Sequence, residues 1–110
     1  MTAELVMGLP LLLAITVGLV WLLAVGAAQV RAVDAAREAA RAMARGDDPA
    51  RAIAVGERVV SDGGRVSITT TGDQVVVVAT GRVEGPGRLF GFLPAVTVRS
   101  EAVALLEGSP

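Results

Sequence analysis

Carboxylates and hydroxyls are the side chains of this chain that could do chemistry, because histidine, cysteine, lysine and tyrosine are all absent. Without these four residue types, the usual general bases, nucleophile activators and zinc ligands are missing. No base is available to activate the serines, which are Ser61, Ser67, Ser100 and Ser109. We therefore predict that the chain is not an enzyme and that it has no catalytic residue, no cofactor and no small-molecule substrate.

Calcium is the metal that acidic side chains could hold without other ligand types. The aspartates to consider are Asp47, Asp48, Asp62 and Asp73. Calcium loops place their acids at alternating positions of one short segment, and no segment of this chain has that spacing. Turn and helix-cap roles account for each aspartate, so we predict no metal site.

Glu4 is the acid whose position indicates a function. The stretch that follows it, residues 5–30, carries no charged side chain. About 20 apolar residues suffice to cross a bilayer as one helix. A carboxylate at the edge of such a segment is costly in lipid and usually has a specific partner. The position of Glu4 points to a protein that later leaves the membrane and packs against copies or relatives of itself.

Length and composition limit the rest of the chain to one small domain. The chain has 110 residues and a formal net charge of −1, with 53% hydrophobic but only 3% aromatic residues. A core of alanine, valine and leucine is therefore expected. The chain has no excess of basic residues with which to bind the phosphates of a nucleic acid, so we expect no nucleic-acid partner. Because cysteine is absent, no disulfide can form and the redox compartment cannot be inferred.

The apolar segment predicts a transmembrane and assembly helix over residues 1–30. Pro10 should kink this helix or mark the end of a separately docked first segment. An arginine- and alanine-rich stretch, residues 31–45, continues the helix outside the membrane, and Gly46 is its expected end. The whole helix would be about 60 Å long at about 1.5 Å per residue. Its glycines and alanines either let another helix approach closely or simply tolerate lipid.

The second half of the chain, residues 31–110, is predicted to be an α+β domain. After the helix extension, Asp48 and Pro49 are typical of a helix start, which predicts a short helix over residues 48–60. A three-stranded antiparallel sheet follows, with strands over residues 65–71, 74–84 and 95–107.

Details of that sheet also follow from its sequence. Gly72 and Asp73 form a two-residue hairpin link, although the order Asp-Gly would be the stronger signal. Four consecutive valines, residues 75–78, suggest a strand that is covered on both faces. In the loop before the last strand, Phe90 and Phe92 either close the core over the sheet or form an exposed contact patch.

Residues 2–10, Thr-Ala-Glu-Leu-Val-Met-Gly-Leu-Pro, together with the leucine run after them, resemble the start of TadE-like pilins of tight-adherence type IV pilus systems. These pilins typically begin with small residues, a glutamate, a short apolar stretch, a proline and a long leucine-rich helix. The later segments resemble members from high-GC, Gram-positive-type bacteria. The resemblance spans most of the chain, but its specific part is the first 25 or so residues.

This resemblance implies a minor pilin or pseudopilin with a pilin-like fold. Such a protein is inserted in the cytoplasmic membrane as a single-pass protein with an extracytoplasmic C-terminal domain. A prepilin peptidase cleaves it, and the pilus assembly machinery extracts it into a filament that serves adhesion. Its partners would be other pilin subunits, bound by helix–helix packing. In such systems the acid near the mature N-terminus pairs with the N-terminal amine of a neighbouring subunit, a role that carries over to Glu4.

Two departures from the prepilin pattern concern the N-terminus. A prepilin has a basic leader that ends in a small residue, with the glutamate at mature position five, whereas this sequence begins at Met1 and has glutamate at position four. As written, arginines follow the span and none precedes it, so the positive-inside rule would place the C-terminal domain in the cytoplasm. An upstream start with a basic leader would reverse that orientation, and we favour this interpretation.

Two other classes of protein remain as alternatives. A small secreted protein would have a signal peptide cleaved before Gln29, after the small residues Gly26, Ala27 and Ala28. Against this, the sequence has no basic n-region and its apolar stretch exceeds the usual length. A single-span membrane scaffold protein would keep an intact N-terminus and would be absent from sheared surface filaments.

Overall fold

The computed structural model describes residues 2–61, 63–85 and 95–106. The fold is α+β, in the order α1 (Ala3–Ala44), α2 (Pro49–Glu57), β1 (Arg65–Thr71), β2 (Gln74–Val83) and β3 (Val96–Leu105). The predicted class is confirmed: a long apolar N-terminal helix, a short second helix and a three-stranded antiparallel sheet. Predictions for Asp62, Phe90, Phe92, Glu107 and Ser109 lie outside the described residues.

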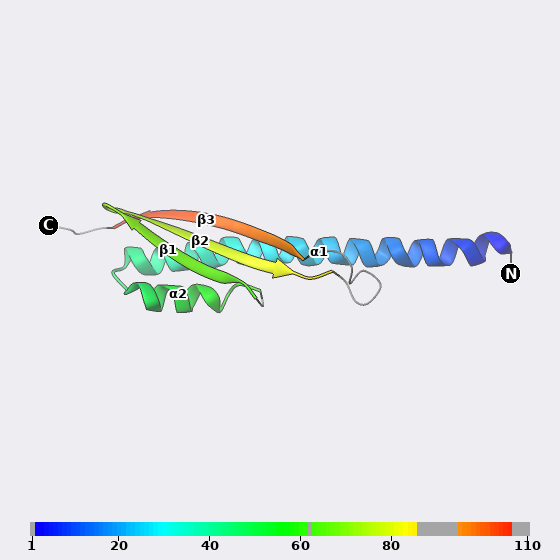
Figure 1. The fold of residues 1–110 in the computed structure, drawn as a ribbon, viewed down its shortest axis with the longest axis horizontal. Coiled ribbons are helices and arrows are strands. Elements are labelled where there is room, and N and C mark those ends of the chain that lie inside the picture. The colour runs from blue at the N-terminus through cyan, green and yellow to red at the C-terminus, as the bar shows by residue number, and fades with distance from the viewer. Residues whose placement is uncertain (1, 62, 86–94, 107–110) are drawn as a thin grey trace.

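The molecule is a rod, 77 Å long and 19 by 17 Å across. Helix α1 sets its length, since 42 residues at about 1.5 Å per residue give roughly 63 Å. The sheet and α2 lie along the C-terminal half of α1, and the N-terminal half extends beyond them (Figure 1). We call the sheet and α2 together the head.

Helix α1 ends where Gly46 turns the chain. Gly46 has a positive φ of 94°, a conformation that glycine adopts without steric cost. Its N–H donates to the carbonyl of Met43 at 3.0 Å, and the N–H of Asp47 donates to the carbonyl of Ala42 at 3.0 Å. These two bonds form a Schellman motif, so the predicted end of the helix at Gly46 is confirmed.

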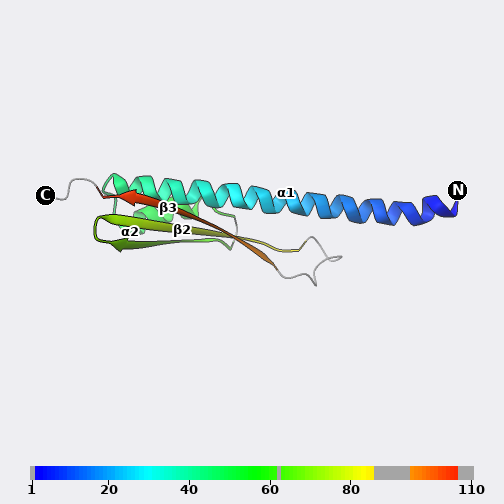
Figure 2. The ribbon, with the colours of Figure 1, turned by 90° about the horizontal axis from the view of Figure 1, so that it is seen from above.

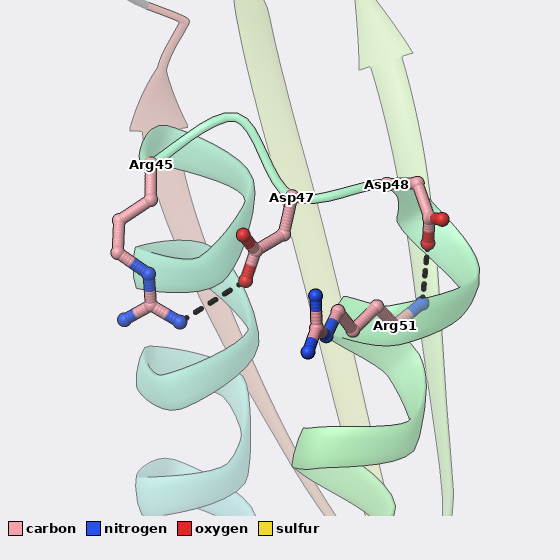
Figure 3. Close-up of polar contacts among 4 residues, drawn as sticks. All are labelled: Arg45, Asp47, Asp48 and Arg51. Atoms are coloured by element: carbon pink, nitrogen blue, oxygen red, sulfur yellow. Dashed lines mark hydrogen bonds and ion pairs between the residues drawn. The ribbon is translucent and has the colours of Figure 1, made fainter.

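Helix α2 begins as its sequence predicts and ends earlier. The carboxylate of Asp48 accepts from the N–H of Arg51 at 2.7 Å, with Pro49 in the first turn (Figure 3). The helix ends at Glu57 rather than at residue 60. The N–H groups of Val59 and Val60 both turn back to the carbonyl of Gly56, at 3.0 and 3.3 Å, which tightens the last turn.

Replacing Asp48 by alanine is expected to lower the free energy of unfolding of the head by about 1 kcal/mol, because the N–H groups of the first turn lose their side-chain acceptor. Thermal unfolding of the full chain in detergent measures the loss. Asp73→Ala, an aspartate in the hairpin turn, is the matched control and should change stability by less than about 0.5 kcal/mol. Equal effects of the two substitutions would contradict the capping role.

The sheet has the strand order β1-β2-β3, and both pairings are antiparallel. Strands β1 and β2 are joined by the predicted two-residue link, with Thr71 opposite Gln74. Gly72 has a φ of 61°, whereas no residue other than glycine has positive φ in the described chain. Positive φ at the first link position alone is the pattern of a type II′ turn, for which the order Gly-Asp is suitable.

One face of the sheet is covered by the two helices. Helix α1 packs on β2 and β3, and α2 packs on α1 and β1 (Figure 2). The core is made of small residues, mostly alanines of α1 facing the valines Val66, Val75, Val77 and Val98. On the opposite face, Val76 and Val78 are half-buried by their neighbours in the sheet and no described element covers them. The expected cover on both faces of β2 is therefore not found within the described chain.

Candidate membrane and assembly helix

The N-terminal half of α1 is apolar and uncovered. Its leucines point outwards on all sides, with Leu12 61% and Leu13 59% exposed. Only 6% of the most apolar stretch of α1 is buried, and α1 is the one helix in the described chain that is long and apolar enough to cross a membrane. A surface of this kind is far larger than soluble monomers expose. It therefore needs lipid or the helices of other proteins around it.

Glu4 lies in the first turn of this uncovered half and is exposed. Just before it, the hydroxyl of Thr2 caps the helix by accepting from the N–H of Leu5 at 3.4 Å. A carboxylate in the first turn complements the positive end of the helix dipole. Within the described residues no ion pair involves Glu4. Its carboxylate is therefore exposed beside the uncovered apolar surface of α1.

Pro10 lies inside α1, which is unbroken from Ala3 onward. The described chain thus has no separately docked first segment. Pro10 lacks an N–H, so the carbonyl of Val6 has no partner in the helix ladder at this point. A missing bond of this kind permits bending. The kink at Pro10 stays a prediction.

Two side chains of α1 bond to the backbone of the sheet and mark where the head begins. The indole N–H of Trp21 donates to the carbonyl of Glu84 at 3.1 Å. Two turns further along α1, the amide of Gln29 donates to the carbonyl of Arg99 at 3.2 Å. Val25 and Ala28 pack into the core between these bonds. The head therefore contacts α1 from Trp21 onward, within the segment predicted as transmembrane from the sequence.

A pocket of about 420 Å³ opens beside α1, directly above Trp21 along the helix. Alanines of α1 and Arg31 form one wall, Val60 and Ser61 a second, and residues 82–84 a third. The guanidinium of Arg82 lies 4.0 Å from the carboxylate of Glu84, and both side chains are more than half exposed. Such an exposed pair stabilises little, so both groups can exchange partners. We call this cavity the arginine pocket.

Ser61 has a buried hydroxyl for which no hydrogen-bond partner exists among the described residues. The oxygen lies 2.8 Å from where a Cβ on Gly81 would be, so glycine is required there unless the serine moves. We expect Ser61→Ala to leave the stability of the head unchanged or to raise it by about 1 kcal/mol, because an unpaired buried hydroxyl is removed. Thermal unfolding beside wild type and Ser67→Ala, an exposed serine of β1, is the measurement. A clear loss of stability for Ser61→Ala alone would refute this.

Three of the aspartates considered as metal ligands, all within the described residues, have local roles in turns and at a helix start. Asp47 follows α1 and pairs with Arg45, with 3.1 Å between the guanidinium and the carboxylate (Figure 3). Asp48 caps α2, and Asp73 occupies the hairpin turn. Ser67 and Ser100 lie in β1 and β3 respectively.

The contacts of Trp21, Gln29 and Arg82 with the rest of the molecule were not predicted from the sequence. Trp21 carried the clearest signal, because it is the single tryptophan of the chain and its N–H needs a partner when the ring is partly buried. Gln29 is the first polar residue after a long apolar stretch that only threonine and tryptophan interrupt. Nothing in the local sequence indicated that Arg82 comes close to α1.

Together these features define a protein whose long N-terminal helix has one uncovered apolar half and one half packed against a small sheet. Residues 1–41 match the family model described as TadE-like protein. The match covers most of α1, so the similarity to TadE-like proteins rests on the helix rather than on the sheet. No curated protein and no solved structure matches the chain.

Proposed function

We propose that this chain is a TadE-like minor pilin or pseudopilin of a tight-adherence type IV pilus, with a structural rather than a catalytic role. The observation that carries the proposal is the uncovered N-terminal half of α1, whose leucines find no cover within the described chain. The match of residues 1–41 to the TadE-like model supports it, because it covers this same helix.

In this proposal the uncovered half of α1 has two successive apolar surroundings. It first anchors the chain in the cytoplasmic membrane as a single pass, with the head on the outer side. After cleavage by a prepilin peptidase, the assembly machinery moves the chain into an adhesive filament, where other pilin helices replace the lipid. Both surroundings cover the same exposed leucines with apolar groups and so remove them from water.

Glu4 provides the specific contact of assembly. Placing an unpaired carboxylate in an apolar environment costs about 3 kcal/mol, the value that membrane-insertion experiments give for charged side chains. The N-terminal amine of the neighbouring subunit is the partner we propose for it. Among the described residues no ion pair of Glu4 competes with this contact.

Replacing Glu4 by glutamine is expected to leave membrane insertion intact and to reduce incorporation into filaments about tenfold. A hydrogen bond to a charged group contributes about 1.5–3 kcal/mol and a neutral one about 1 kcal/mol, and a difference of about 1.4 kcal/mol corresponds to a factor of ten. The measurement is the ratio of the chain in sheared surface material to the chain in membranes, by quantitative immunoblot from cells that express the native pilus system.

Glu38→Gln is the matched control, because it makes the same chemical change in α1 at a position beside the head. Its pairing with Arg41, at 3.8 Å on the surface, stabilises little. We expect Glu38→Gln to incorporate like wild type. Wild-type incorporation of Glu4→Gln would refute the assembly role of Glu4.

The secreted-protein alternative predicts cleavage before Gln29. The packing of the head argues against this, because Val25 and Ala28 belong to the core and Trp21 bonds to Glu84. Cleavage at that site would remove all three contacts. A membrane scaffold protein would be absent from sheared surface filaments, whereas a pilin would be found in them. Detection of the chain in the sheared fraction therefore distinguishes these two proposals.

A further inference from the structure

We propose that the arginine pocket binds the phosphate of an anionic phospholipid headgroup, so that the head rests on the bilayer surface before assembly. This inference rests on the proposed function, because it requires that α1 spans the membrane. The residues that would hold the phosphate are Arg31 of α1 and Arg82 of β2.

The length of the uncovered half of α1 places the pocket at the depth of the headgroups. Residues 3–20 precede the first bond to the head and span about 27 Å, close to the hydrocarbon thickness of about 30 Å. Trp21 then falls at the boundary, where tryptophan is enriched in membrane proteins. Its N–H is already paired with the carbonyl of Glu84, 3.1 Å away, which fixes the end of β2 at the same level.

The pocket begins just above this boundary. Its helix wall runs from Ala24 to Arg31, which is about 5 to 15 Å further along the axis than Trp21. A bilayer of about 40–45 Å in total has a polar layer of about 5–7 Å on each side of its core, so this layer reaches the lower part of the pocket, beside Ala24. A phospholipid beside α1 therefore has its phosphate at the height of the lower part of the pocket, and the side chains of Arg31 and Arg82 also line this pocket.

The charges of the pocket favour an anion. Arg31 and Arg82 supply two positive charges, and Glu84 supplies one negative charge that is 4.0 Å from Arg82. The balance is one positive charge, which matches a phosphodiester that carries one negative charge. Guanidinium groups bind phosphate through pairs of parallel hydrogen bonds, so these two arginines are suitable ligands. The net positive charge of the pocket would repel the cationic group of a headgroup such as that of phosphatidylcholine.

The walls of the pocket also favour a lipid over a second copy of this chain. Ala24, Ala27 and Ala28 form an apolar wall on which the glycerol region of a lipid can lie. The uncovered helix of a neighbouring subunit is uncharged from residue 5 onward, and its one acid, Glu4, pairs with the N-terminal amine in the proposed assembly, so it would leave no partner for either guanidinium. A phospholipid supplies both an apolar part and an anion, and the proposal commits to it.

The test is native mass spectrometry of the full chain released from detergent in the presence of phosphatidylglycerol, phosphatidylcholine or inorganic phosphate. Three proteins are compared: wild type, the double variant Arg31→Gln/Arg82→Gln, and the control Arg51→Gln. Arg51 is an exposed arginine in the first turn of α2, near Arg45 and Asp47 after the end of α1 (Figure 3). It does not line the pocket, so its substitution removes a positive charge and leaves the pocket unchanged. Trp21 emission verifies that the head is folded in each protein.

We expect wild type and Arg51→Gln to retain one phosphatidylglycerol, and the double variant to bind it at least about tenfold more weakly, because two charged hydrogen-bond donors are lost. Phosphatidylcholine and inorganic phosphate should bind more weakly than phosphatidylglycerol in wild type and in Arg51→Gln, and the double variant should lose this preference. Equal retention by wild type and the double variant would overturn the proposal, as would stronger binding of free phosphate than of the lipid. Failure of wild type to float with phosphatidylglycerol vesicles would instead refute the membrane anchor of the proposed function.

Discussion

Ala39→Leu is expected to lower the free energy of unfolding of the head by about 3 kcal/mol, the upper part of the range for overpacking a core. Ala39 is fully buried, at 0% exposure, in the layer between α1, α2 and the sheet. Its Cβ lies only 3.3 Å from where a Cβ on Gly56 would be, which is closer than an ordinary van der Waals contact. Helices α1 and α2 therefore leave no free space between Ala39 and Gly56. Three added carbon atoms have no space there unless α2 moves away from α1.

The measurement is the thermal unfolding of the full chain in detergent, followed by Trp21 fluorescence, because the indole bonds to the head through Glu84. Ala54→Leu is the matched control, since Ala54 is on the exposed side of α2. It should change stability by less than about 0.5 kcal/mol. If Ala39→Leu were as stable as this control, the close approach of α1 and α2 would be wrong.

The double variant Leu12→Arg/Ile15→Arg is expected to lose stable membrane insertion. Each arginine near the centre of a transmembrane helix costs about 3 kcal/mol and each lost leucine or isoleucine about 0.5 kcal/mol, so the pair shifts insertion by roughly 7 kcal/mol. Both positions are exposed in the uncovered half of α1, with Leu12 61% and Ile15 50% exposed. The fold of the head should be unaffected, because neither side chain contacts it.

The control for this variant is Val103→Arg/Leu105→Arg, which adds the same charges to exposed apolar positions of β3. These side chains lie on the face of the sheet away from α1, so membrane insertion should be retained. Resistance to alkaline carbonate extraction reports insertion of each protein. Full resistance of the Leu12→Arg/Ile15→Arg variant would contradict the assignment of this half of α1 to the membrane.

The elements of the fold were predictable because local signals in the sequence agree with one another. The uncharged stretch and the alanine-rich continuation predicted one long helix that ends at Gly46. Glycine is a reliable signal there because the chain turns with a positive φ, which other residues rarely adopt. Asp48 and Pro49 gave the start of α2. The hairpin link at Gly72 and Asp73 was also predicted, and Thr71 pairs with Gln74 across it.

The position of the head along α1 could not be predicted, because it depends on contacts between residues far apart in the sequence. Apolar residues of the uncovered half and of the core side of α1 form one continuous stretch, so composition alone placed the end of the predicted span at residue 30. The bond between Trp21 and Glu84 shows that the head already contacts the helix nine residues earlier. The arginine pocket arises in the same way, since Arg31 and Arg82 meet only through the packing of β2 on α1.

The mature N-terminus of the chain, determined by mass spectrometry on membranes and on sheared surface filaments, tests the central claim most directly. The gene should be expressed from its native upstream region, so that any leader is included. The pilin proposal predicts a cut just before Glu4, with the resulting peptide present in the sheared fraction. An N-terminus at Gln29 would identify a secreted protein, and an intact Met1 confined to membranes would identify an anchored domain; either result would contradict the proposal.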